Sequence, residues 1–287
     1  MLLSLSFFPL SCFLLLLDII RVTMFFRGGG AMDRRDYLKL LFSFICANFI
    51  PYKIKAEALA EVFTFSQIKY NKGDWNPDPS AALNLLKRVE SFTSVLTDKR
   101  FDNYRNVVDI TKDNIFEYPF LYITGHYEFE EFSNDVIHRL RVFLSNGGLL
   151  VCDDCAGTSG MGFDKSIRNL IKSIFPDKSL LPLPYDHTIF QTYFLIQDFR
   201  IGRRLITRSV EGVDIGDLTP VLYFRNDLGC AWEMENNRWV HNCVPYGELQ
   251  RALAFKMGVN IVMYALCANY KKDEIHIPEI MRKRGRR

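Results

Sequence analysis

Thiol and carboxylate side chains stand next to one another at Cys152-Asp153-Asp154-Cys155, directly after the apolar run 149–151. Two cysteines separated by two residues can form a redox pair or contribute half of a metal site. Cys152 continues the apolar run, however, and the two aspartates disfavour formation of a thiolate. The sequence has no second cysteine pair of this spacing, so a four-ligand zinc site would need histidines such as His126, His187 or His241. We therefore predict no metal site, and the cofactor stays unknown.

Cys155 is also a candidate nucleophile. The order of an apolar run, then Cys155-Ala156-Gly157, then a helical pattern is typical of a nucleophile elbow, where a sharp turn presents a reactive side chain above the sheet. Such chemistry needs a general base, for which His126 and His187 are available. The alternative is an unreactive thiol packed in a tight turn. The catalytic set Cys155, His126 and His187 therefore applies only if the protein is an enzyme, which the sequence leaves open.

Other polar residues indicate ligand binding. Gly125-His126 follows an apolar run and can bind an anion through backbone amides, or His126 can act as an acid or base. Asp153 and Asp154 can bind a hard cation or cap the following turn. A carboxylate adjoins an indole in two places, which suits a polar ligand or a sugar face, although core packing of the indole beside a solvated acid is the more usual arrangement. The predicted ligand-binding set is Asp74, Trp75, Gly125, His126, Asp153, Asp154, Gly157, His187, Trp232 and Glu233.

The hydrophobic periodicity predicts the elements that position these residues. Apolar or alternating runs predict strands, and spacings of three and four residues predict helices. Because strands and helices alternate, we expect an open parallel sheet with right-handed crossovers and helices on both faces. The first helix is expected to begin at Asp78-Pro79, with Asp78 as its N-cap. The expected strands are 62–70, 107–110, 120–124, 149–151 and 221–224, and later helices follow Ser133 and span about 164–175 and 248–270.

In such a sheet, ligands bind outside the carboxyl ends of the strands. The polar residues after 120–124 and 149–151 stand at those ends. We therefore expect Asp74, His126, the two aspartates, Cys155 and His187 to converge on one edge of the sheet.

The amino-terminal residues read as a targeting segment. Arg27-Gly28-Gly29-Gly30 before Met32 suggests that translation starts at Met32 and that 1–31 is an untranslated leader read as protein. Residues 32–60 resemble a twin-arginine export signal: paired arginines at Arg34-Arg35 precede a short apolar run and small residues suited to cleavage. The expected location is exported, either periplasmic or membrane-associated, and an uncleaved signal would contact the membrane.

The remaining chain is expected to hold a single α/β domain over 61–270 and a basic tail over 271–287, of which the last part, 281–287, is expected to be disordered. The net charge of +3 arises at the two ends, since acidic residues outnumber basic ones in 59–281. This charge balance excludes a nucleic-acid-binding surface of the usual kind. The seven cysteines are too few for a disulfide-stapled scaffold.

Several short motifs in a fixed order resemble the domain-of-unknown-function 4159 family. They span nearly all of the expected domain, from about Val62 to Tyr270. The resemblance implies a flavodoxin-like fold similar to class I glutamine amidotransferases, in exported or membrane-associated proteins with no established activity. The family does not require cysteine at the position of Cys155, a departure from the amidotransferase pattern. The motifs are Gly73-Asp74-Trp75, Tyr118-Pro119-Phe120-Leu121-Tyr122, Thr124-Gly125-His126, Asn146-Gly147-Gly148, Asp153-Asp154 with Gly157, Asp186-His187, Ile189-Phe190, Gly229 with Ala231-Trp232-Glu233, and Gly258-Val259-Asn260 with Tyr264-Ala265-Leu266.

Taken together, these features predict an exported protein that binds a small polar ligand or a protein partner at the carboxyl edge of its sheet. Two alternatives remain open. One is a cysteine-dependent hydrolase or amidotransferase-like enzyme that uses Cys155. The other is a structural component of the cell envelope, whose partner would be an envelope protein.

Overall fold

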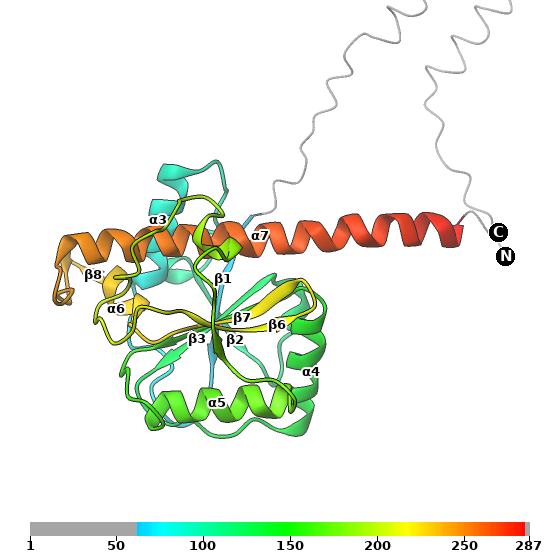
Figure 1. Cartoon of the computed structure of the whole chain (residues 1–287), viewed down its shortest axis with the longest axis horizontal. Helices are drawn as coiled ribbons and strands as arrows, with labels where there is room; N and C mark the ends of the chain where they lie inside the picture. The colour runs from blue at the N-terminus through cyan, green and yellow to red at the C-terminus, as the bar shows by residue number, and fades with distance from the viewer. Residues whose placement is uncertain (1–61, 285–287) are drawn as a thin grey trace, which may run out of the picture. The chain divides into compact units, whose positions relative to one another are not determined.

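A seven-stranded sheet in the order β2-β1-β3-β4-β7-β6-β5 forms the centre of the protein (Figure 1). The computed structural model describes residues 62–284, and for 268–284 it describes only the backbone. The chain divides into the units Met1–Ala58 and Leu59–Arg287, and all described residues belong to the second. The strands are β1 (Phe65–Lys69), β2 (Arg105–Asp109), β3 (Phe120–Gly125), β4 (Leu149–Asp154), β5 (Leu181–Pro182), β6 (Glu211–Ile215) and β7 (Leu218–Phe224).

The expectation of an α/β protein with a mainly parallel sheet is confirmed. Strands β2, β1, β3, β4 and β7 are parallel, whereas β6 and β5 extend the sheet with antiparallel pairing. The sequence analysis missed β5 and β6. The first has only two residues, and the second contains Gly212, so neither shows the alternation that marks a strand.

Helices cover both faces of the sheet (Figure 1). The helices α3, α6 and α7 lie on one face, and α4 and α5 on the other. Short 3-10 turns η1, η2 and η3 and a small hairpin, β8–β9, complete the chain. The bounds are α3 (Ala81–Phe92), α4 (Asn134–Ser145), α5 (Gly162–Ile174), α6 (Leu228–Trp232), α7 (Glu248–Arg284), η1 (Asp102–Tyr104), η2 (Ile115–Glu117), η3 (Thr188–Phe190), β8 (Met234–Glu235) and β9 (Arg238–Trp239).

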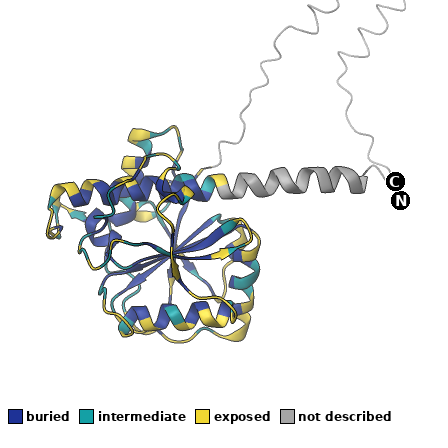
Figure 2. Ribbon diagram, viewed as in Figure 1, coloured by how far each residue is buried: buried dark blue, intermediate teal, exposed yellow. Residues whose placement is uncertain are grey.

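Strand alternation divides the buried side chains between two cores. On β4, Leu149 and Val151 pack in the core below α3, α6 and α7, whereas Leu150 and Cys152 pack in the core below α4 and α5. All residues of β3 and β4 are buried (Figure 2), as expected for strands covered on both faces. Because the side-chain period of a strand is two, consecutive residues at the end of β4 must point to opposite faces.

Two helix boundaries differ from the expectation. Helix α3 begins at Ala81 with Ser80 as its N-cap, so Asp78 is not the N-cap, and its side chain faces the carboxyl edge of the sheet instead. The helix expected over 248–270 continues in the backbone to Arg284, so it includes most of the expected basic tail, 271–287, and reaches into the segment expected to be disordered, 281–287. The Lys, Glu, Met and Arg residues of this segment favour a helix.

The expected leader, 1–31, and signal segment, 32–60, lie outside the described residues. Within residues 62–284, no helix combines the length and the apolar character needed to cross a membrane.

Candidate functional site

The ends of three parallel strands meet at one edge of the sheet. In the register of the sheet, Gly125 pairs with Asp154, and Asp153 pairs with Phe224. The polar segments that follow β3, β4 and β7 therefore begin at the same level. The segment between β1 and α3, which carries Asp74 and Asp78, closes over these strand ends. This is the edge where the sequence predicted a site.

Asp74 and His126 form a hydrogen-bonded pair at this edge. The Asp74 Oδ2 atom lies 2.6 Å from His126 Nδ1, while Oδ1 accepts hydrogen bonds from the backbone N–H groups of His126 at 2.8 Å and Tyr127 at 3.3 Å. The side chains of His126 and Asp74 are 36% and 29% exposed. In the neutral imidazole, a carboxylate at Nδ1 favours the proton on that nitrogen, and Nε2 is then an acceptor. No described residue forms a hydrogen bond or ion pair with Nε2 within residues 62–267.

Gly125 makes the approach of Asp74 possible. A Cβ atom at this position would overlap the Tyr70 hydroxyl and would lie 3.2 Å from Asp74 Oδ1. The same hydroxyl donates a hydrogen bond to the carbonyl oxygen of Thr124 at 2.8 Å. Gly125 therefore has a role in packing at the site, and no contact assigns it a direct role in ligand binding.

Asp153 ties β4 to α6. It is fully buried, and its carboxylate accepts hydrogen bonds from the Tyr122 hydroxyl at 2.6 Å and from the backbone N–H groups of Leu228 at 2.8 Å and Gly229 at 2.7 Å. Burial, and then the negative charge of Asp227, raise the pKa of Asp153 to about 7. These internal partners give the carboxylate a structural role.

Asp154 points to the opposite face of the sheet. Its Oδ1 atom accepts hydrogen bonds from the N–H groups of Ala156 and Gly157, both at 2.9 Å, and its Oδ2 atom accepts one from the Tyr223 hydroxyl at 3.1 Å. Burial raises the pKa of Asp154. The structure thus separates the two aspartates, and Asp154 closes the turn that contains Gly157.

Cys155 lies in a buried group with a second cysteine. Its Sγ atom is 3.1 Å from Thr124 Oγ1 and 3.7 Å from Asp78 Oδ2. A hydrogen bond with Cys230, and then burial, raise the pKa of the Cys155 thiol well above its ordinary value. Cys152, by contrast, packs in the core below α4 and α5. The two cysteines of the sequence motif therefore face opposite sides of the sheet.

Four buried residues bring thiols and carboxylates together, and we call them the thiol–carboxylate cluster: Asp78, Cys155, Asp227 and Cys230. One sulfur or carboxylate oxygen of each lies within 4.8 Å of the others. The sequence analysis missed three of the four. Asp227 and Cys230 follow β7, so their position after an expected strand was the available signal, whereas Asp78 was interpreted as a helix cap.

His241, which the sequence analysis named as a possible partner in a zinc site, also reaches this region. Its Nε2 atom lies 4.0 Å from Asp78 Oδ1, and its side chain is 35% exposed. Burial, and then the positive charge of Arg203, lower the pKa of His241.

His187 lies apart from the other predicted site residues. Its Nε2 atom is 2.9 Å from the Thr219 hydroxyl, near the amino end of β7, and its Nδ1 atom accepts a hydrogen bond from the N–H of Ile189. The strand rise of about 3.3 Å per residue separates Thr219 from the carboxyl end of β7 by roughly 16 Å. His187 is thus too far from Cys155 to serve as its base.

The two places where a carboxylate adjoins a tryptophan are Asp74-Trp75 and Trp232-Glu233, and both tryptophans and Glu233 contact other residues of the protein. Trp232 is 1% exposed and packs in the core below α7. Both carboxylate oxygens of Glu233 accept hydrogen bonds from the Ser80 N–H, at 3.2 and 3.0 Å, and so satisfy a free donor at the start of α3. Trp75 is half-buried, with the cations of Lys69 and Arg105 5.7 and 5.6 Å from its ring.

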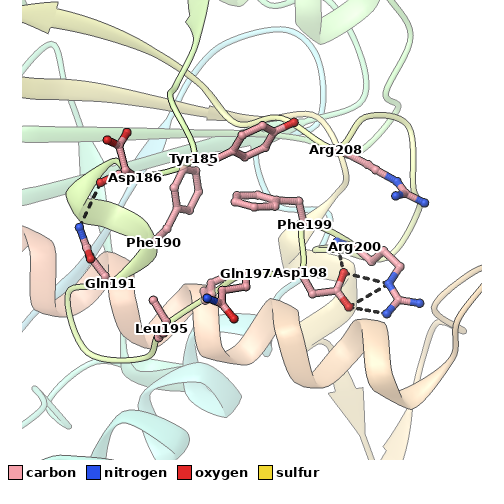
Figure 3. A pocket seen from close by; sticks show the side chains of 11 residues that line it. Tyr185, Asp186, Phe190, Gln191, Leu195, Gln197, Asp198, Phe199, Arg200 and Arg208 are labelled. Atoms are coloured by element: carbon pink, nitrogen blue, oxygen red, sulfur yellow. Dashed lines mark hydrogen bonds and ion pairs between the residues drawn. The ribbon is translucent and has the colours of Figure 1, made fainter.

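A pocket of about 980 Å³ opens in the segment between β5 and β6 (Figure 3). The rings of Tyr185, Phe190 and Phe199 lie on one side of it, and the ion pair of Asp198 with Arg200 lies on another. None of the predicted site residues lines this pocket. The candidate site at the strand ends is therefore separate from this pocket and is defined by its side-chain chemistry.

The comparisons with known proteins agree with the resemblance in the motifs. A family model described as Domain of unknown function (DUF4159) matches residues 64–266. No curated protein matches the chain.

Proposed function

This chain belongs to the DUF4159 family, and we propose that it binds a small polar ligand at the carboxyl edge of its sheet, with His126 as the contact residue. The observation that carries the proposal is the Asp74–His126 pair. One carboxylate accepts three hydrogen bonds from His126 and Tyr127 and so holds the imidazole in one orientation. A partly exposed pair of a carboxylate and an imidazole contributes at most about 1 kcal/mol to stability, so stability alone is a weak reason for such an arrangement.

The chemistry of the pair supports a ligand that donates a hydrogen bond. With the Nδ1 proton directed to Asp74, the Nε2 lone pair of His126 is an acceptor for a hydroxyl or amine group. The exposed ring of Tyr127 stands beside the imidazole, with 6.0 Å between ring centroids. An aromatic face beside a fixed acceptor suits a polyol, sugar or similar compound with one less polar face.

The enzymatic alternative receives less support from the contacts of Cys155. A cysteine nucleophile requires a thiolate and a base within hydrogen-bond reach. The raised pKa of Cys155 disfavours the thiolate, and Thr124, Asp78 and Cys230 surround its sulfur. The proposal therefore assigns Cys155 no catalytic role.

We also propose that the fold is flavodoxin-like and that the protein is exported. The order β2-β1-β3-β4-β7 of the parallel strands is consistent with a flavodoxin-like fold of the class I glutamine amidotransferase type. The twin-arginine-type segment 32–60 supports a periplasmic or membrane-associated location. In that location an envelope protein is the alternative partner to a small ligand, and a structural envelope role remains the third proposal.

A thermal-shift screen of the full chain tests the binding function. Sugars, polyols, amino acids and nucleosides serve as probes, and a ligand is expected to raise the melting temperature of the wild type. The His126→Ala and Asp74→Asn variants should lose this shift, because one lacks the imidazole and the other lacks the acceptor for Nδ1–H. His138→Ala is the matched control, since His138 is exposed on α4.

Two results would contradict the proposal. In the first, a ligand stabilises the wild type and His126→Ala to the same extent, which removes His126 from the binding site. In the second, no polar compound stabilises the wild type, which favours the structural envelope role.

A further inference from the structure

We propose that the thiol–carboxylate cluster is a binding site for a divalent transition-metal ion of zinc type, with Asp78, Cys155, Asp227 and Cys230 as ligands. The inference goes beyond the ligand-binding function proposed above and does not rest on it, because His126 and Asp74 are not among the four ligands.

The four residues converge from three places in the chain. Asp78 precedes α3, Cys155 follows β4, and Asp227 and Cys230 follow β7 at the start of α6. All four are 5% exposed or less, and one candidate ligand atom from each lies within 4.8 Å of the others. Buried thiols are common as core residues, but two thiols and two carboxylates in one buried group require compensation for their polarity.

One carboxylate oxygen of Asp78 has no hydrogen-bond partner among the described residues, which indicates that a cation fits beside it. The Asp78 Oδ1 atom is buried and accepts no hydrogen bond from any residue in the described part of the chain. Its nearest basic group is His241 Nε2 at 4.0 Å, beyond hydrogen-bond distance. Leaving a buried carboxylate oxygen without a partner destabilises the folded state. A cation bound in the cluster would remove that cost.

The charges around the cluster are mainly negative. Arg203 pairs with Asp227 through one oxygen at 2.5 Å and is the cation in direct contact with the cluster among the described side chains. One arginine compensates one of the two carboxylates, and the charge of a divalent cation would offset the two thiolates that form when the cysteines release their protons on metal binding.

The ligand types favour zinc over the hard cations. Thiolates select zinc and other soft metals, whereas calcium and magnesium prefer sites made of oxygen alone. Tetrahedral zinc with Zn–S of about 2.3 Å and Zn–O of about 2.1 Å places sulfur and oxygen ligands about 3.6 Å apart. The Cys155 Sγ to Asp78 Oδ2 distance of 3.7 Å is close to that value.

The backbone around the cluster allows the side chains of Asp78 and Asp227 to come close to the other ligands. A Cβ atom at Gly229 would lie only 2.5 Å from Asp78 Oδ2 and 3.1 Å from the Tyr122 hydroxyl. Glycine at this position is therefore required for Asp78 to reach the cluster. Asp227 adopts a left-handed conformation with φ of 63°, which directs its Oδ1 atom to the N–H of Cys230.

Metal analysis of the reduced full chain after zinc loading and removal of free metal tests the inference. We expect about one zinc ion per chain. The Cys155→Ser and Cys230→Ser variants should bind zinc at least ~100-fold more weakly, because even changes outside the first ligand shell cost 10–100-fold. Cys267→Ser is the matched control, since Cys267 is exposed and lies outside the cluster. The His126→Ala variant should keep its zinc, so failure of the ligand proposal and failure of this one are distinguishable.

Cobalt loading of the wild type gives a readout that needs no variant to fold. Cobalt in a tetrahedral site with two thiolates is expected to show a sulfur-to-cobalt charge-transfer band and intense visible bands. Asp78→Asn tests the carboxylate with a side chain of the same size and should weaken zinc binding. Gly229→Ala should do the same by displacing Asp78.

Either of two results would overturn the inference. One is wild-type protein that takes up neither zinc nor cobalt after reduction. A Cys155–Cys230 disulfide in the unreduced protein, combined with that result, would identify a redox pair instead. The other is zinc binding in Cys155→Ser and Cys230→Ser that equals that of Cys267→Ser while the variants stay folded by circular dichroism.

Discussion

At the scale of single residues, adjacent carboxylates have different environments. Asp153 faces α6 and accepts two backbone hydrogen bonds there, whereas Asp154 faces the other side of β4 and closes a turn. Both are fully buried. Their roles follow from strand alternation, which sends neighbouring side chains into different cores.

The first prediction concerns Asp154. Replacement by Ala removes the acceptor for the N–H groups of Ala156 and Gly157 and for the Tyr223 hydroxyl, so the free energy of unfolding should fall by about 2 kcal/mol. Asp154→Asn should lose less, because its Oδ1 atom still accepts both N–H groups. Denaturant unfolding measures these changes. A stable Asp154→Asn variant that loses all ligand-induced stabilisation would show that this carboxylate acts in ligand binding.

The second prediction concerns the pH dependence of stability. Hydrogen bonds from Arg100 lower the pKa of Asp98 to about 2, and the side chain of Asp98 is 2% exposed. A carboxyl whose pKa is lower in the folded state stabilises the protein above its unfolded pKa and loses that contribution as the pH falls. Stability should therefore decline from about pH 4 to about pH 2.

Melting temperatures of the wild type and Asp98→Asn across this range measure the effect. The variant should be less stable near neutral pH and should decline less in acid, while the exposed Asp102→Asn should follow the wild type. Parallel pH profiles for the wild type and Asp98→Asn would refute the assignment.

At the scale of elements, α3, α6 and α7 pack closely enough to hold the cluster in place. Gly258 of α7 lies against Leu85 of α3 and Trp232 of α6, where an added Cβ would approach Trp232 Cζ2 to 2.9 Å. Leu85 and Trp232 are each 1% exposed, so neither has space to move away. The contact between α7 and the shorter helices thus depends on a glycine, despite its cost in helix propensity.

The third prediction follows from that contact. Gly258→Ala should lower the free energy of unfolding by about 1–3 kcal/mol through overpacking, although alanine is the better helix former. Ala252→Ser, at an exposed position of the same helix, adds one atom without a steric conflict and is the control. Equal stability of Gly258→Ala and the wild type would show that α7 moves away from α3 at no cost.

At the scale of the whole molecule, the described residues contain both cores. One lies below α3, α6 and α7 and the other below α4 and α5, and their buried members fall between Phe63 and Ala265. The candidate site and the thiol–carboxylate cluster draw all their residues from this part of the chain.

The fourth prediction is that a chain beginning at Leu59 folds by itself. It should show one cooperative thermal transition and the same zinc content as the full chain, because the buried members of both cores and all four residues of the cluster lie after Leu59. Thermal circular dichroism and metal analysis provide the measurements. Aggregation of the shorter chain under conditions where the full chain is soluble would show that residues before Leu59 belong to the folded body.

The sequence by itself determined most of the longer local elements and the edge of the sheet that carries the candidate site. Neighbouring residues encode the alternation in β1, the apolar run of β4 and the helical spacing of α4. They also encode the N-cap of α4, where Ser133 accepts a hydrogen bond from the N–H of Val136. Such patterns predict an element before any tertiary contact is known. They also placed His126 and Cys155 correctly at the ends of parallel strands.

Tertiary structure alone decided which side chains meet. Cys155 joins Cys230 because β4 lies beside β7 in the sheet, although β5 and β6 separate them in the sequence. Asp78 reaches the cluster because α3 begins three residues later, and His187 is excluded because its loop packs at the amino end of β7. Strand order and loop packing depend on how the whole chain buries its apolar surface, and local periodicity carries no record of that.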